Sequence, residues 1–239
     1  MIPLPRRLLA EFLGTGLLVA VVIGSGIAAQ QLSPDDTGLQ LLQNSITTVF
    51  GLGVLILMFG PVSGAHFNPA VSAVDWWLGR RGRTGLSAPE LGAYVTAQIA
   101  GGIAGAVLAN VMFELPAGQL AVTDRSSPGL WVGEVVATAG LVMVILALAR
   151  TGRASLSAVA VASWIGAAYW FTSSTSFANP AVTVSRMFSD TFAGIAPASV
   201  PAFLLAQLVG AAIGVGLTVV LYPAVERAAG AVVVERESA

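Results

Sequence analysis

The sequence contains no cysteine, a single histidine and few charged residues. Without cysteine there are neither disulfide bonds nor thiol chemistry, and one histidine is too few for a transition-metal cage, so neither a metal ion nor a cofactor is expected. Only 10% of the 239 residues are charged, whereas 56% are hydrophobic. So little polar surface cannot cover a soluble core, and the sequence therefore predicts an integral membrane protein. The formal net charge of -1 gives no sign of nucleic-acid binding.

Six apolar segments are long enough to cross a bilayer. They cover approximately residues 8–29, 39–60, 88–112, 129–149, 156–175 and 199–222. An even number of spans places both termini on one side of the membrane. The arginines expected on that side are Arg6, Arg7, Arg80, Arg81, Arg83, Arg150, Arg153, Arg227 and Arg236, against Arg125 and Arg186 on the other. Because basic residues accumulate on the cytoplasmic side, we predict cytoplasmic termini and a location in the bacterial inner membrane.

An Asn-Pro-Ala tripeptide occurs twice, and each copy precedes a short apolar segment. The copies are Asn68, Pro69 and Ala70, and Asn179, Pro180 and Ala181. Asparagine is a favoured N-cap and proline a favoured first helical residue, so each copy predicts the start of a helix. Segments 69–78 and 180–189 would each be roughly 15 Å long and, meeting at their N-termini, would cover the hydrocarbon core. Two half-helices of this kind are expected to line a pore.

The two halves of the chain resemble each other, as in an inverted repeat, where three spans per half reverse the orientation of the second copy. Glu11 in the first span matches Glu134 in the fourth, and Gln98 in the third matches Gln207 in the sixth. The third and sixth spans also share a GxxxG motif, which we expect to allow close helix packing within the fold. We predict one channel domain over residues 1–239, with repeats at about 6–112 and 129–224.

These residues carry a family resemblance over nearly the whole chain. The segment from Ser63 to Val71, the second Asn-Pro-Ala, the Ala10-Glu11-Phe12 start and the repeated Ala-Gln pairs resemble the aquaporin, or major intrinsic protein, family. The resemblance implies an all-α membrane protein of the aquaporin type, with six transmembrane helices, two re-entrant half-helices and one pore per subunit in a homotetramer. It implies that the protein is a channel and not an enzyme. The partners of this channel are water, small neutral solutes and the lipid bilayer.

The expected half-helices would direct their partial positive charges at the bilayer centre and oppose the passage of cations. If the oxygens of Asn68 and Asn179 cap backbone N–H groups, their amide NH2 groups remain free to donate to a passing hydroxyl. Ionisable groups such as Glu11 and Glu134 are functional candidates inside apolar spans. The resemblance implies that they brace the re-entrant loops, and a proton relay is the alternative. The same resemblance implies that His66 is a loop brace or a pore-lining donor rather than a metal ligand.

The sequence departs from the family at the selectivity filter. The position after the second Asn-Pro-Ala usually holds an arginine, and here it is Val182. By the family's spacing, the fifth-span filter position is Ala167, and the loop position is Ser176 or Phe177. These residues imply a filter that is wide and largely apolar.

Two further filter positions stay open. The second-span residue is Phe50 in one register and Thr48 in another. Arg186 lies one helical turn beyond Val182 and is a candidate for a displaced cation at the outer mouth.

The wide filter resembles that of bacterial aquaglyceroporin-like channels associated with arsenic resistance, which pass neutral arsenite. The predicted function is therefore a passive channel for small neutral solutes, of polyol or arsenite type, as well as water. An ordinary water or glycerol channel with its filter arginine displaced to Arg186 is one alternative. A proton-coupled secondary transporter is the alternative of another class.

Overall fold

The computed structural model describes residues 2–80, 82 and 84–223, and over these ranges the regular structure is entirely helical. Arg81, Arg83, Arg227 and Arg236 lie outside them. The α-helices are α1 (Leu4–Leu32), α2 (Thr37–Ser63), α3 (Pro69–Gly79), α4 (Ala88–Met112), α5 (Pro128–Arg150), α6 (Ser157–Phe171), α7 (Pro180–Ser185) and α8 (Val200–Leu221). Short 3-10 turns cover Ala154–Leu156, Arg186–Phe188 and Pro197–Ser199.

Six of the described helices are long and apolar enough to cross a membrane, which confirms the predicted spans. They are α1, α2, α4, α5, α6 with its preceding 3-10 turn, and α8 with its preceding 3-10 turn. The predicted fifth span continued to residue 175, but α6 ends at Phe171. Thr175 and Ser176 have φ of 60° and 54°, which a right-handed helix does not allow, so residues 172–179 form a loop instead.

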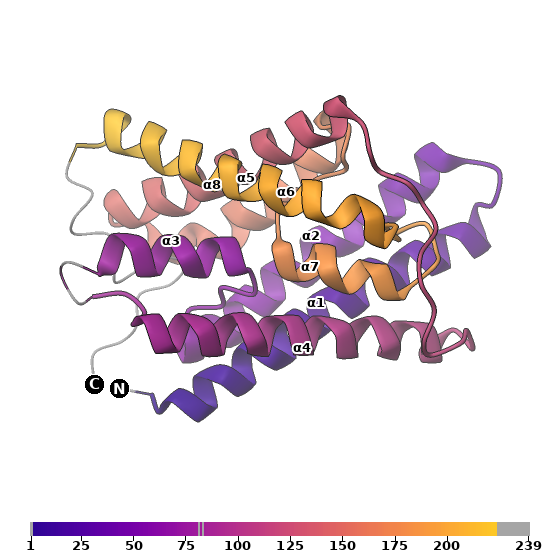
Figure 1. Ribbon diagram of the computed structural model, residues 1–239, viewed down its shortest axis with the longest axis horizontal. Helices are drawn as coiled ribbons and strands as arrows, with labels where there is room; N and C mark the ends of the chain where they lie inside the picture. The colour runs from indigo at the N-terminus through magenta and orange to yellow at the C-terminus, as the bar shows by residue number, and fades with distance from the viewer. Residues whose placement is uncertain (1, 81, 83, 224–239) are drawn as a thin grey trace.

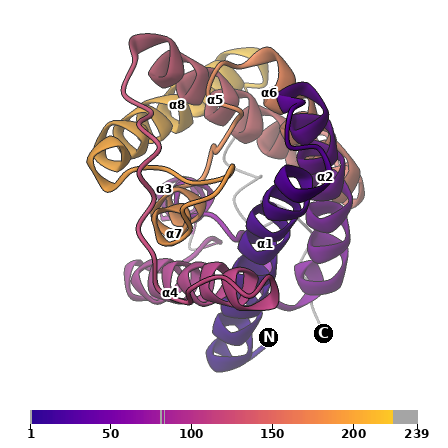
Figure 2. The same ribbon diagram turned by 90° about the vertical axis from the view of Figure 1, so that its right-hand side faces the viewer.

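The helices surround two short ones, as Figures 1 and 2 show. Helices α3 and α7 contact each other, and both pack against α4 and α8. Figure 1 places the N-terminus and the end of α8 at one end of the molecule, which we call the proximal end. The opposite, distal end holds the loops 33–36, 113–127 and 189–196. From their adjacent starts, α3 runs toward the proximal end and α7 toward the distal end, as the two predicted half-helices require.

The GxxxG glycines bring pairs of helices into backbone contact, so the predicted role in close packing is confirmed. A Cβ atom on Gly105 of α4 would lie 2.0 Å from the carbonyl oxygen of Gly16 in α1. In the second repeat, a Cβ atom on Gly214 of α8 would lie 2.5 Å from the carbonyl oxygen of Ala139 in α5. The pairs α1 with α4 and α5 with α8 are thus equivalent contacts of the two repeats.

Candidate pore and filter

The half-helices begin at the two asparagines, as predicted. Asn68 has an extended φ of -151°, and its side-chain oxygen accepts from the backbone N–H of Ala70 at 2.9 Å. Asn179 has a φ of -155°, and its oxygen accepts from the N–H of Ala181 at the same distance. Each asparagine therefore satisfies a helix-terminal donor that no carbonyl of its own helix can reach.

The amide nitrogens of the two asparagines link the two halves of the chain. Asn68 Nδ2 donates to the carbonyl oxygen of Ala178 at 2.8 Å, and Asn179 Nδ2 donates to that of Phe67 at 2.7 Å. The expectation of wholly free NH2 groups is therefore corrected, because one hydrogen of each is used in this exchange. One hydrogen per amide remains for a solute, and both asparagines line the central cavity.

The loops before the half-helices have matching backbone strain. Ala65 and Ser176, three residues before each asparagine, have φ of 48° and 54°, and Phe67 and Ala178, one residue before, have φ of 48° and 49°. Residues other than glycine rarely adopt this left-handed conformation, so the surrounding structure must hold it.

Glu11 of α1 holds the first of these loops. Its Oε1 accepts from the backbone N–H of His66 at 3.0 Å and from Ser63 Oγ at 2.6 Å. Its Oε2 accepts from the N–H of Phe67 at 2.8 Å and from Gln98 Nε2 at 2.7 Å. The carboxylate is fully buried, so these four donors replace its hydration.

Glu134 of α5 holds the second loop in the same way. Its Oε1 accepts from the N–H of Phe177 at 2.9 Å, and its Oε2 accepts from the N–H of Ala178 at 2.9 Å and from Gln207 Nε2 at 2.6 Å. Both oxygens of this buried carboxylate bind donors of the fold. This geometry favours loop bracing over the alternative of a proton relay.

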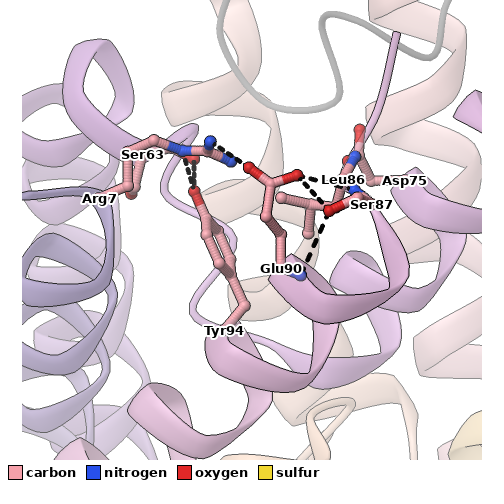
Figure 3. Close-up of polar contacts among 7 residues, drawn as sticks. All are labelled: Arg7, Ser63, Asp75, Leu86, Ser87, Glu90 and Tyr94. Atoms are coloured by element: carbon pink, nitrogen blue, oxygen red, sulfur yellow. Dashed lines mark hydrogen bonds and ion pairs between the residues drawn. The ribbon is translucent and has the colours of Figure 1, made fainter. Parts of the chain in front are cut away.

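A polar network at the proximal end supports the first brace (Figure 3). Arg7 Nε donates to Tyr94 Oη at 2.9 Å, and Tyr94 Oη donates to the carbonyl oxygen of Ser63 at 2.9 Å. Arg7 Nη1 also forms an ion pair of 2.7 Å with Glu90, whose carboxylate caps the start of α4 through Ser87. The starts of α1 and α4 are thus tied to the residue whose hydroxyl contacts Glu11.

His66 belongs to this region rather than to a metal site. Its backbone is held by Glu11, its Nδ1 lies 3.0 Å from Ser72 Oγ, and its ring packs against Tyr94 with the centroids 5.4 Å apart. It also lines the central cavity. Within the described residues no cluster of three or more histidine or acidic side chains is arranged to hold a metal ion.

The cavity runs past both asparagines and has a volume of about 60 Å³. At roughly 10–15 Å³ for each water centre, it accommodates about four to six water molecules. Its walls come from both repeats: Leu18, Val22, Thr48, Leu52 and Ile56 in the first, and Leu141, Ile145, Val161, Ile165 and Tyr169 in the second. Most of these side chains are apolar. The polar lining residues are His66 on the proximal side, the two asparagines at the half-helix junction, and Thr48, Tyr169, Ser176 and Arg186 in the distal part.

The structure distinguishes the two candidates for the second-span filter position. Thr48 is buried and lines the cavity, whereas Phe50 is 70% exposed on the outer surface of α2. Leu52, four residues after Thr48, also faces the cavity. At about 100° per residue, a residue two positions away from both points to the opposite side of the helix. Phe50 is therefore corrected to a position on the outer surface.

The fifth-span prediction fails for the same geometric reason. Ile165 and Tyr169 line the cavity, while Ala167 between them is exposed on the outside of α6. The position predicted to be small thus belongs to Tyr169, whose hydroxyl lies 3.2 Å from Thr48 Oγ1. A pair of hydroxyls therefore lies in the cavity wall, of which the sequence indicated only that of Thr48, as one of two alternatives.

The remaining filter candidates all line the cavity: Ser176, Phe177, Val182 and Arg186. Arg186 is only 3% exposed and lies over the ring of Phe177, with its guanidinium carbon 3.5 Å from the ring centroid. Its Nε donates to the carbonyl oxygen of Ala193. The serine and the phenylalanine proposed as alternatives for one position thus both reach the cavity.

This architecture defines a class of protein: a membrane channel in which two capped half-helices meet inside a bundle of six spanning helices. The same fold occurs in the X-ray structure of the aquaglyceroporin from Plasmodium falciparum, with a TM-score of 0.63 and 21% sequence identity over 94% of this chain and 99% of that one.

Sequence comparison assigns the family. The chain belongs to the major intrinsic protein family, whose profile matches residues 2–176. It is 50% identical over 214 residues to the aquaglyceroporin AqpS of Rhizobium meliloti strain 1021, covering 90% of this chain and 89% of that one. It is 35% identical to a glycerol uptake facilitator protein of Pseudomonas aeruginosa, over 61% of this chain and 57% of that one. Members of this family are passive channels and not enzymes, and the protein is an integral membrane protein.

Proposed function

We propose that this channel conducts small neutral hydroxylated solutes, polyols and the neutral trihydroxide of arsenite, in addition to water. The observation that carries the proposal is Val182, an apolar side chain in the cavity wall at the position where the family usually has arginine. Without an arginine there, the wall has a smaller side chain and lacks the five N–H donors of a guanidinium, so the passage is wider and less polar at this point. The names of the two relatives, an aquaglyceroporin and a glycerol facilitator, agree with this solute class.

A second candidate is a water or glycerol channel whose filter arginine has moved to Arg186. The buried position of Arg186 in the cavity wall favours it. Four residues along a helix correspond to about 6 Å, so the cation would act one turn further toward the distal end. The Thr48 and Tyr169 hydroxyls would then complete a more polar filter than the sequence predicted.

Val182→Arg tests the proposal in proteoliposomes. The long side chain should lower the permeability of glycerol and arsenite relative to that of water by about tenfold or more, which is a barrier increase of about 1.4 kcal/mol. Stopped-flow measurement of the solute-to-water ratio cancels differences in the amount of inserted protein. Val182→Leu adds volume without charge and should change the ratio much less.

The outcomes separate the two candidates. An unchanged ratio in Val182→Arg contradicts the proposed role of Val182. In that case Arg186→Val shows why. A large increase in the permeability of glycerol and arsenite identifies Arg186 as the filter cation. An unchanged permeability indicates that other residues determine the solute class.

The membrane orientation and the oligomeric state that the family resemblance implies are part of the same proposal. Termini in the cytoplasm agree with the described arginines, because Arg6, Arg7, Arg80, Arg150 and Arg153 lie toward the proximal end. We place the protein in a bacterial inner membrane as a homotetramer, with the distal end outside. Light scattering of the detergent-solubilised protein tests the tetramer, and protease access to a tag after residue 239 tests the orientation.

A further inference from the structure

Two arginines at the distal end of the molecule contact one aromatic ring, that of Phe177, which lines the cavity. The guanidinium carbon of Arg186 lies 3.5 Å from the centroid of Phe177, and that of Arg125 lies 5.2 Å from it. Arg125 comes from the loop between α4 and α5, and Arg186 follows α7, so the two cations are 61 positions apart in the chain and are brought together by the fold.

Neither cation has an acidic partner. Within residues 2–80, 82 and 84–223 the ion pair is that of Arg7 with Glu90, at the other end of the molecule. Asp124 is next to Arg125 in sequence, but its carboxylate accepts from Ser199 Oγ at 2.8 Å. Burial lowers the pKa of Arg125, because desolvation outweighs the attraction of Glu134. Glu134 attracts both arginines, but its oxygens already accept from the N–H groups of Phe177 and Ala178 and from Gln207. The buried Arg186 and the half-buried Arg125 still repel each other, and an added anion relieves this.

The backbone around the arginines is fixed by their own hydrogen bonds. Arg125 donates from Nε to the carbonyl oxygen of Gly194 at 2.9 Å and from Nη2 to that of Phe192 at 3.3 Å, and Arg186 donates from Nε to that of Ala193. Three consecutive carbonyls thus position both guanidinium groups. A Cβ atom on Gly194 would lie 2.6 Å from the carbonyl oxygen of Ser189, so this loop fits closely. These hydrogen bonds therefore hold both arginine side chains in fixed positions.

The part of Arg186 that faces the cavity still has hydrogen-bonding capacity. Among the described residues, Arg186 donates to the protein through Nε. Its Nη1 and Nη2 therefore remain available to donate to a ligand. Ser176, which is 3% exposed and lines the same cavity, has a buried hydroxyl without a partner among the described residues. The guanidinium group of Arg186 and the hydroxyl of Ser176 therefore line the same cavity.

We propose that Arg186 and Ser176, with Arg125 as a second cation nearby, bind a small planar oxyanion of the nitrate or formate type at the distal end of the cavity. The two Nη atoms match two oxygens of a planar anion. The anion binds and does not pass, because apart from the two asparagine amides most of the wall beyond it is apolar, with Leu52, Ile56 and Val161 offering no replacement for its hydration. Bound there, it blocks neutral flux.

Nitrate tests this site independently of which neutral solute the channel carries. Water permeability of proteoliposomes is measured by stopped flow while nitrate replaces gluconate, at equal concentration on both sides and constant ionic strength. Permeability should fall to about half when nitrate reaches its dissociation constant, since an occupied cavity carries no flux. Gluconate is also an oxyanion but is too large for the cavity, so it controls for general salt effects.

Binding is measured separately by thermal unfolding in detergent. Nitrate at about ten times its dissociation constant should raise the melting temperature by about 3 °C over gluconate. Arg186→Met should abolish both effects. If Arg186→Met does not fold, Arg186→Lys keeps the charge but loses the planar fork, and should need about tenfold more nitrate. Arg153→Met, which removes an exposed arginine at the proximal end, should respond like the parent protein.

Equal permeability and melting temperature in nitrate and gluconate would overturn the proposal. So would a full nitrate response in the Arg186 variants, or its loss in Arg153→Met. A protein that conducts water but neither glycerol nor arsenite contradicts the proposed function alone, because nitrate block of water flux remains measurable.

Discussion

At the scale of single residues, each buried glutamate holds a strained loop in place. Glu134 accepts from two successive backbone N–H groups, at Phe177 and Ala178, and Glu11 accepts from the equivalent pair. Because Ala178 and Phe67 have left-handed φ, these hydrogen bonds stabilise a conformation that the residues disfavour on their own. The carboxylates therefore fix the carbonyls that the opposite asparagines bind.

Replacement of Glu134 separates this role from proton transport. Glu134→Gln keeps one strong acceptor, and Gln207, whose Oε1 has no hydrogen-bond partner among the described residues, can turn to accept from the new amide. Flux should persist with a modest loss of stability. Glu134→Ala leaves both loop donors unsatisfied, at about 1–3 kcal/mol each, and should lower the melting temperature and the yield of folded protein. Thermal unfolding and stopped-flow flux on the same preparations measure both.

A transporter gives a different pattern. Loss of transport in the glutamine variants of both Glu11 and Glu134 with normal melting temperatures, together with proton-coupled uptake by the parent, would contradict the brace.

The residue scale also shows what the sequence predicted and what it did not. The N-caps at Asn68 and Asn179 follow from local preferences, and the structure has them. The bonds from these asparagines to carbonyls of the opposite loop join residues about a hundred positions apart, and no local rule indicates them. The family's spacing indicates Ala167 rather than Tyr169, because spacing alone does not say which face of α6 points into the cavity. The structure shows that this face carries Ile165 and Tyr169, four residues apart.

At the scale of helices, the packing of α4 on α1 depends on the absence of a side chain. A Cβ atom on Gly105 would lie 2.0 Å from the carbonyl oxygen of Gly16, and backbone cannot move aside as a flexible side chain can. The GxxxG motif predicted this contact from sequence. The partner face on α1 was not predictable, because α1 carries no repeated motif that marks it.

Gly105→Val should therefore separate α1 from α4 and destabilise the protein by about 3 kcal/mol or more, an overpacking effect against rigid backbone. Glu11 and Gln98 lie on these two helices, so the first loop should lose its brace. Melting temperature and the yield of folded protein are the measurements. Gly92→Val is the matched control, since a Cβ atom there meets nothing within 4 Å. Equal stability of the two variants would show that close packing is unnecessary.

At the scale of the whole molecule, the two half-helices place their N-termini together at the middle of the channel. The asparagines cap them without adding charge, so the positive ends of α3 and α7 remain exposed to whatever enters the cavity. We therefore expect a barrier to cations that depends on both repeats together, because each repeat supplies one of the two positive ends.

Asn68→Asp should weaken that barrier. A carboxylate can still cap the helix but places a negative charge at the junction, so sodium or proton leak should rise by about tenfold while water flux persists. Conductance measured in planar bilayers, normalised to water flux, checks this. Asp75→Asn changes a buried carboxylate that binds the backbone N–H of Leu86, outside the cavity, and serves as the control. Unchanged cation conductance in folded Asn68→Asp would contradict the central barrier.

The exchange of bonds between the two loops also constrains the order of events during synthesis. Phe67 leaves the ribosome well before Asn179, whose amide its carbonyl binds, and Asn68 likewise precedes Ala178. The first half of the channel therefore enters the membrane with these two polar groups lacking their final partners. Until the last third of the protein has been translated, water or the insertion machinery must satisfy them, so the first re-entrant loop is completed only when the second arrives.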